Sequence, residues 1–238
     1  MTTNLLREMN TPEIIGEAFR LYRDHLASLV IMALAPHLAL LVLGLALDAM
    51  NLAPANVLAV LLGVTVALNA LVLAAMTYAI AGAALGHMPG VGESYRRGFG
   101  GRVLWVIAAY MIVWVLITLG FLALVVPGLI IGGLFLPTVP LIVLERMRPL
   151  QALSQAVQMM KPHLLRGTLV FAFVVLISGV LPLVIQAFLG AGPLSPLLGA
   201  IAGAMTLPLA YSANVVLYFS VRAAQGFGPE QLEEALRG

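Results

Sequence analysis

Long uncharged apolar segments alternate with short polar connections along the whole chain. Six segments lack Asp, Glu, Lys and Arg, and they run approximately over 26–47, 57–85, 103–126, 129–144, 167–189 and 197–221. A helix needs about 20 apolar residues to cross the hydrocarbon core of a bilayer. The pattern therefore predicts an all-α fold: a polytopic membrane bundle of six transmembrane helices arranged as three hairpins. The fourth segment holds Gly132, Gly133, Pro137 and Pro140, which leaves open a full crossing or a kinked half-span.

A short amphipathic segment precedes each predicted hairpin and is expected to form an interfacial helix. In the first, Thr11 is the expected N-cap, and apolar residues follow at helical spacing over 14–22. The stretch 91–96 repeats the character of 15–20 position by position, and 150–161 is a weaker third copy. We interpret the chain as one integral membrane domain, 1–238, with repeat units at approximately 11–86, 89–145 and 149–222 and a tail at 223–238.

Composition agrees with this pattern and excludes a soluble globular protein. Of 238 residues, 62% are hydrophobic and 9% are charged, and the mean hydropathy is +1.06. An ordinary soluble domain carries about 25% charged residues. The chain has no cysteine, which excludes disulfides and thiolate metal sites.

Basic residues mark one side of the predicted bundle. All 12 Lys and Arg lie before the first segment, in the second and fourth connections or after the last segment: Arg7, Arg20, Arg23, Arg96, Arg97, Arg102, Arg146, Arg148, Lys161, Arg166, Arg222 and Arg237. The first, third and fifth connections (48–56, around Pro127–Gly128, and 190–196) have none. By the positive-inside rule, both termini of this multi-pass chain are cytoplasmic. The charge balance is thereby explained without a nucleic-acid partner.

Polar residues inside the segments do not form a recognisable catalytic group. His37 lies about halfway along the first segment, and we expect a neutral imidazole bonded to a helix carbonyl or to Asn69 rather than a proton relay. The chain has no HExxH, Walker loop, GxGxxG or Ser–His–Asp grouping. We therefore expect no enzyme activity, no cofactor and no metal site.

Glu145 is the most informative charged residue, because a carboxylate there opposes the basic bias of its connection. It should need a partner such as Arg96, Arg166 or Arg222. The stretch 145–148 fits either charges that orient the fourth span by snorkelling or a ligand site. The residues we expect to bind a lipid headgroup or a partner protein are Arg20, Arg96, Arg97, Glu145, Arg146, Tyr218 and Arg222.

Several short motifs resemble one known family. They are Pro127-Gly128-Leu129-Ile130, the run Pro140 to Glu145, Ala152-Leu153 with Lys161, the opening Ile15 to Arg23, and the closing Leu217 to Arg222 with Gly226-Phe227. Together they are similar to the membrane domain found beside glycerophosphodiester phosphodiesterases and in related uncharacterised six-span bacterial proteins. The resemblance implies a membrane module of the bacterial inner membrane. It does not carry over the phosphodiesterase reaction, because the catalytic barrel has no counterpart in these residues.

Three hypotheses on function follow from the sequence. The favoured one is a non-catalytic membrane module that is associated with anionic lipid headgroups on its cytoplasmic face or is accessory to a partner membrane protein. The alternative is a transporter, channel or lipid-translocating protein whose pathway is lined by Thr138, Gln186, Thr206 and Asn214. A membrane enzyme is the weakest hypothesis, because only Glu145 and interfacial histidines offer acid–base chemistry.

Overall fold

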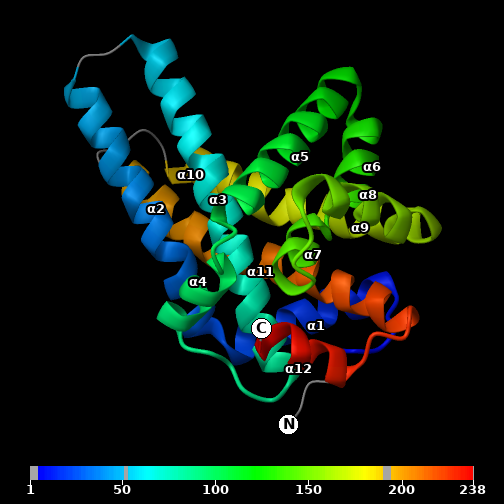
Figure 1. Ribbon diagram of the computed structural model, residues 1–238. Helices are drawn as coiled ribbons and strands as arrows, with labels where there is room; N and C mark the ends of the chain where they lie inside the picture. The colour runs from blue at the N-terminus through cyan, green and yellow to red at the C-terminus, as the bar shows by residue number, and fades with distance from the viewer. Residues whose placement is uncertain (1–4, 51–52, 190–193, 238) are drawn as a thin grey trace.

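The computed structural model describes residues 5–50, 53–189 and 194–237, and its regular elements there are all helical (Figure 1). The helices are α1 (Thr11–Asp24), α2 (Leu26–Ala49), α3 (Pro54–Ala84), α4 (Val91–Phe99), α5 (Val103–Ala123), α6 (Val125–Phe135), α7 (Thr138–Leu144), α8 (Pro149–Met160), α9 (Leu164–Val175), α10 (Leu181–Leu189), α11 (Ser195–Ala224) and α12 (Pro229–Arg237). Six stretches within these residues are long and apolar enough to cross a membrane. The predicted all-α bundle with six spans is confirmed, and the chain is a multi-pass membrane protein.

The three hairpins pack by one cyclic rule. Each amphipathic helix lies against the last span of the hairpin before it: α4 on α3, α8 on α6 and α7, and α1 on α11, which closes the circle. The first span of each hairpin follows the same rule, since α5 packs on α3, α9 on α6 and α2 on α11. Three copies of one repeat unit are expected to pack in this way.

Helix α1 begins one residue earlier than the sequence predicts. Asn10, not Thr11, is the N-cap: its side chain accepts from the Glu13 backbone N–H, and the Glu13 carboxylate accepts from the Asn10 backbone N–H. This reciprocal capping box satisfies two N–H groups that Thr11 would leave to water. The buried face of α1 is Ile14, Ala18 and Leu21.

The reversal between the third and fourth spans lies at Leu124, so the predicted turn around Pro127–Gly128 is wrong. Leu124 is extended, with φ −168° and ψ 159°, and α6 begins directly after it. Pro127 is tolerated there because the N–H groups of a first helical turn have no intrahelical partner. Gly128 lies against the ring of Phe121, and a Cβ at Gly128 would come within 2.6 Å of that ring.

The fourth span is broken. It consists of α6 and α7, and Leu136 and Pro137 separate the two helices. Gly133 of α6 meets Gly167 of α9 so closely that a Cβ on Gly133 would lie 2.6 Å from the Gly167 backbone carbon. Small residues permit such a close approach where lipid gives no hydrophobic drive for association.

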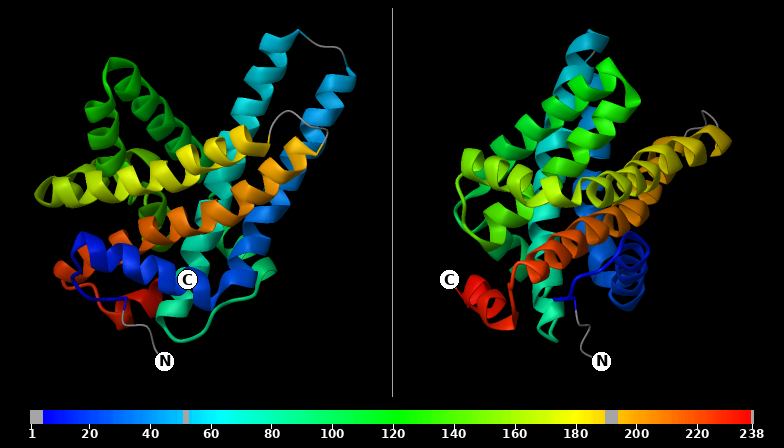
Figure 2. Two further views of the ribbon diagram at one scale, coloured as in Figure 1. Left: turned by 180° about the vertical axis from the view of Figure 1, so that it is seen from behind. Right: turned by 90° about the vertical axis from the view of Figure 1, so that its right-hand side faces the viewer.

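The fifth span begins close to its prediction: α9 starts at Leu164, after the amphipathic helix α8, three residues before the predicted start at 167. Helices α8, α9 and α10 follow one another with only a short 3-10 turn, Lys161–His163, and a π-helical turn, Leu176–Val180, between them. Figure 2 shows α9 and α10 as one long rod beside α11, lying across the direction of the α2–α3 hairpin. The π-helical turn comes just before Pro182, whose ring would otherwise crowd the preceding turn.

Both ends of the chain fold back onto the bundle, which the sequence did not predict. Leu5 and Met9 are buried, and the Met9 N–H donates to the Ser220 hydroxyl of α11 at 2.8 Å. The tail forms α12, which buries Leu232 and Leu236 and packs against α3 and α7. Its apolar i, i+4 spacing was a readable helix signal.

Candidate functional site

Glu145 lies at the C-terminal end of α7 and contacts two side chains one turn apart on α11. Its Oε1 accepts from the Tyr218 hydroxyl at 2.8 Å and from Arg222 Nε at 2.7 Å. Arg222 Nη2 donates to the other carboxylate oxygen, Oε2. The guanidinium therefore binds the carboxylate through two parallel hydrogen bonds, the strongest geometry for this pair.

This pair, which we name the α7–α11 clasp, is largely withdrawn from solvent. The exposed side-chain fractions are 18% for Glu145 and 13% for Arg222. Arg222 Nη1 also donates to Gln225 Oε1 at 2.7 Å. The prediction that Glu145 needs a basic partner is confirmed for Arg222, whereas Arg166 pairs with Glu8 at 3.2 Å. Because its donors and acceptors are already matched, the clasp joins two spans and offers little to a ligand.

Arg146 follows Glu145 but points to a different site. Its φ of 57° is the one positive φ of a non-glycine residue in the described part of the chain. A side chain in this left-handed region costs about 1 kcal/mol or more. This conformation lies directly after the end of α7 at Leu144.

Arg146 lines a cavity together with three arginines from the α4 region. This cavity, which we name the arginine pocket, has a volume of about 270 Å³. Its arginines are Arg96, Arg97, Arg102 and Arg146. Tyr78 of α3, Val143 of α7 and Ala235 and Leu236 of α12 complete its wall. No carboxylate side chain is among the described residues that line it.

The four arginines differ in their contacts. Arg97 pairs with Glu93 at 3.2 Å and donates to the Leu236 carbonyl, which ties α4 to the end of α12. Arg102 lies over the Trp105 ring at 5.9 Å. Within the described residues, Arg96, Arg102 and Arg146 have no carboxylate within ion-pair distance. Three cations thus face one cavity without a counter-ion among the residues that the structure describes.

Helix α4 is held rigidly enough to position these arginines. A Cβ on Gly98 would lie 2.9 Å from the Ala74 carbonyl, so α4 touches the α3 backbone directly. The Tyr95 hydroxyl donates to the Met32 carbonyl of α2, and burial raises the pKa of Tyr95 to about 12. The phenol therefore remains a hydrogen-bond donor at neutral pH.

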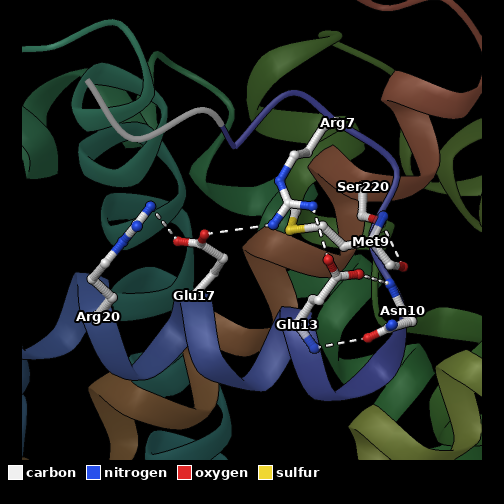
Figure 3. A network of polar contacts seen from close by, with 7 residues as sticks. All are labelled: Arg7, Met9, Asn10, Glu13, Glu17, Arg20 and Ser220. Atoms are coloured by element: carbon white, nitrogen blue, oxygen red, sulfur yellow. Dashed lines mark hydrogen bonds and ion pairs between the residues drawn. The ribbon is translucent and has the colours of Figure 1, made fainter. Parts of the chain in front are cut away.

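Arg20, the remaining predicted binding residue, lies elsewhere. Figure 3 shows it in a chain of ion pairs along α1, where Arg20 contacts Glu17 at 2.7 Å and Arg7 contacts Glu13 at 3.0 Å. The seven predicted residues therefore separate into the clasp, the arginine pocket and this α1 network. Arg102 was not predicted, although its place beside Arg96 and Arg97 in one connection was a usable signal.

Polar residues of the proposed pathway do not meet as a group. Thr138 and Asn214 line one cavity inside the bundle. The Thr206 hydroxyl instead donates to Ala202 of its own helix, and Gln186 is an exposed side chain on α10. His37 Nδ1 lies 2.7 Å from the Ala33 carbonyl, in line with the expected bond to a helix carbonyl.

Comparison with known proteins adds no assignment: no family model, no curated protein and no solved structure matches the chain. Across 5–50, 53–189 and 194–237, no group of three His, Asp or Glu residues is placed to hold a metal ion. The function is therefore inferred from the geometry of the chain itself.

Proposed function

We propose that this protein is a non-catalytic membrane module that holds an anionic lipid headgroup in the arginine pocket. The observation that carries the proposal is the convergence of four arginines on one cavity with no acidic lining among the described residues; three of the four have no carboxylate partner there. Like charges gathered in this way repel one another, and a bound phosphate would relieve the repulsion. Arginine is well suited to phosphate because its planar fork donates two parallel hydrogen bonds.

The place of the pocket in the chain favours a lipid as the source of the phosphate. The pocket lies near the C-terminal ends of the spans α3 and α7, and the short helices α4 and α12 and the α4–α5 connection supply the rest of its lining. These are the segments that the basic bias assigns to the cytoplasmic surface, where anionic headgroups lie. We propose the bacterial inner membrane as the location and kinship with the phosphodiesterase membrane domain on the motifs given above.

The test is native mass spectrometry of the protein in mild detergent, titrated with phosphatidylglycerol and, separately, with phosphatidylcholine. Arg96→Gln and Arg146→Gly should each weaken retention of phosphatidylglycerol about fivefold, since one basic residue near the headgroups contributes about 1 kcal/mol. Arg20→Gln is the matched control, because it removes the same charge from a residue that is already paired with Glu17.

Two results would contradict the proposal. Equal losses for all three variants would indicate diffuse attraction to the whole basic face. A stoichiometric partner protein, retained with bulk lipid alone, would favour the accessory role instead.

A competition experiment separates a lipid from a soluble anion. Inorganic phosphate in excess should compete weakly with phosphatidylglycerol, because it lacks the acyl chains that anchor the lipid. Equally strong competition by inorganic phosphate would indicate a soluble anion as the ligand.

Transport is a second candidate, and the cavity that Thr138 and Asn214 line is the observation that favours it. A translocating protein should accelerate the movement of labelled lipid between leaflets of a proteoliposome. Val139→Phe would fill part of this cavity and should slow that movement, whereas Gly63→Ala, with open space around its Cα, should not. If labelled lipid moved between leaflets no faster with the unmodified protein than in protein-free liposomes, this candidate would be excluded.

A further inference from the structure

A second cavity lies inside the bundle, where six helices converge. Its volume is about 90 Å³, and its lining comes from α3, α5, α6, α7, α9 and α11. The wall is mostly apolar and includes five aromatic side chains: Tyr110, Trp114, Phe135, Phe171 and Tyr211. No Asp, Glu, Lys or Arg lines it within the described residues. A charged ligand would find no counter-ion here.

Two polar atoms in this wall lack hydrogen-bond partners. They are Thr138 Oγ1 and Asn214 Oδ1, on side chains whose exposed fractions are 1% and 5%. An unsatisfied buried polar group costs about 1–3 kcal/mol. An occupant that supplies hydrogen bonds to both groups would remove this cost.

Five other hydroxyls in the spans are satisfied within their own helices, whereas Thr138 at the cavity, like Ser212 away from it, is not. Thr77, Thr118, Thr168, Ser178 and Thr206 each donate to the carbonyl four residues earlier in the helix. Thr138 is the first residue of α7, directly after the break at Pro137, so it has no preceding helical turn of its own helix to bond. The broken fourth span is therefore the reason why its hydroxyl remains available to a ligand.

The occupant must combine two properties. Asn214 Oδ1 is an acceptor, and its partner must therefore be a donor such as a hydroxyl. The apolar wall favours hydrocarbon over water. Trp114, in the wall, is only partly buried, which allows entry from the lipid side of α5. We infer that this cavity binds the hydroxyl end of an uncharged, chain-bearing amphiphile, an activity independent of the arginine pocket.

One tryptophan in the wall provides the test. The chain has two tryptophans, Trp105 and Trp114, so a Trp105→Phe protein reports on the cavity through Trp114 fluorescence alone. The probes are 6-bromohexan-1-ol, whose bromine quenches indole, and its methyl ether, which cannot donate a hydrogen bond. We expect saturable quenching by the alcohol and a linear, partition-type quenching by the ether.

Side-chain variants in the same background identify the acceptors. Thr138→Val and Asn214→Leu should each raise the half-saturating alcohol concentration about fivefold, the effect of one lost hydrogen bond. Thr206→Val is the matched control, since its hydroxyl bonds within α11, and it should leave the curve unchanged. If the alcohol and the ether quenched Trp114 fluorescence equally, the inference would be overturned, and this comparison needs no cavity variant. The absence of saturable quenching, as expected of a cavity filled with water, would also overturn it.

Discussion

Two groups of arginines lie on the basic surface of this bundle and differ in their counter-ions. Along α1, Arg7 and Arg20 contact Glu13 and Glu17, and the charges cancel within the helix and its N-terminal flank (Figure 3). In the arginine pocket, four arginines, of which only Arg97 has a carboxylate partner, face a cavity without an acidic lining in the part of the chain that the structure describes. Basic residues that only orient a membrane protein have no need to converge. The lack of counter-ions, rather than the number of basic residues, therefore distinguishes a candidate binding site.

Arg222 in the α7–α11 clasp is a fully paired arginine that is largely withdrawn from solvent. Breaking its ion pair should change the free energy of unfolding more than any other substitution considered. Glu145→Ala leaves Arg222 and Tyr218 without their acceptor in a poorly hydrated place. We expect the free energy of unfolding to fall by about 3 kcal/mol. Denaturant unfolding in detergent, followed by far-ultraviolet circular dichroism, measures this change.

Tyr218→Phe is the control for the clasp, since it keeps the ion pair and removes one hydrogen bond. Its cost should be about 1 kcal/mol. If Glu145→Ala were as mild as Tyr218→Phe, the clasp would be a surface pair of little consequence. That result would remove the distinction between it and the arginine pocket.

A carboxylate placed inside the arginine pocket should give its arginines a counter-ion, as the arginines along α1 already have. Ala235 of α12 lines the cavity beside Arg146. Ala235→Glu supplies a counter-ion to the arginines and repels phosphate, so retention of phosphatidylglycerol should fall about tenfold. Ala235→Gln has the same size without the charge and should change retention less than twofold. An equal loss in both variants would indicate that bulk, not charge, blocks the pocket.

The backbone of Arg146 offers a sharper separation of stability from binding. Arg146→Gly relieves the left-handed conformation, so the free energy of unfolding should rise by roughly 0.5–1 kcal/mol. The same variant should lose lipid retention, as argued above. Thermal unfolding in detergent tests the first effect, and Arg148→Gly, at a neighbouring arginine with φ −70°, should not be stabilising. A destabilised Arg146→Gly protein would contradict a strained backbone at this position.

The sequence predicted the architecture well because charge-free segments of membrane-spanning length admit few other folds. The partner of Glu145 was also within reach, since a carboxylate among arginines needs one. The boundaries were harder. Pro127 indicated a turn, but a proline in the first helical turn costs little, so the reversal moved to Leu124.

The sites themselves were only half predictable. Arg96, Arg97 and Arg146 were identified as basic, but their convergence depends on α12, and the tail was not predicted to be helical. The pairing of Arg20 with Glu17 was readable from its i, i+3 spacing. The orphaned hydroxyl of Thr138 was not, because it follows from a break between α6 and α7 whose position no local pattern fixes.

The ion pairs along α1 should make the stability of the protein depend on pH, and this effect should be the smallest of those predicted. The Asn10 backbone N–H, and after it Arg7, hold the pKa of Glu13 below its ordinary value of 4.5. A lowered pKa means that the ionised carboxylate stabilises the fold above pH 4.5, and that this contribution is lost as the pH falls through the lowered pKa.

Glu13→Gln keeps the cap geometry but cannot ionise, so it isolates this contribution. We expect its melting temperature to lie below that of the unmodified protein at pH 6 and the two values to converge towards pH 3. Differential scanning fluorimetry in detergent measures both proteins across that range. A gap that stays constant with pH would mean that Glu13 acts through its hydrogen bond alone, and that charge pairing along α1 contributes nothing to contrast with the arginine pocket.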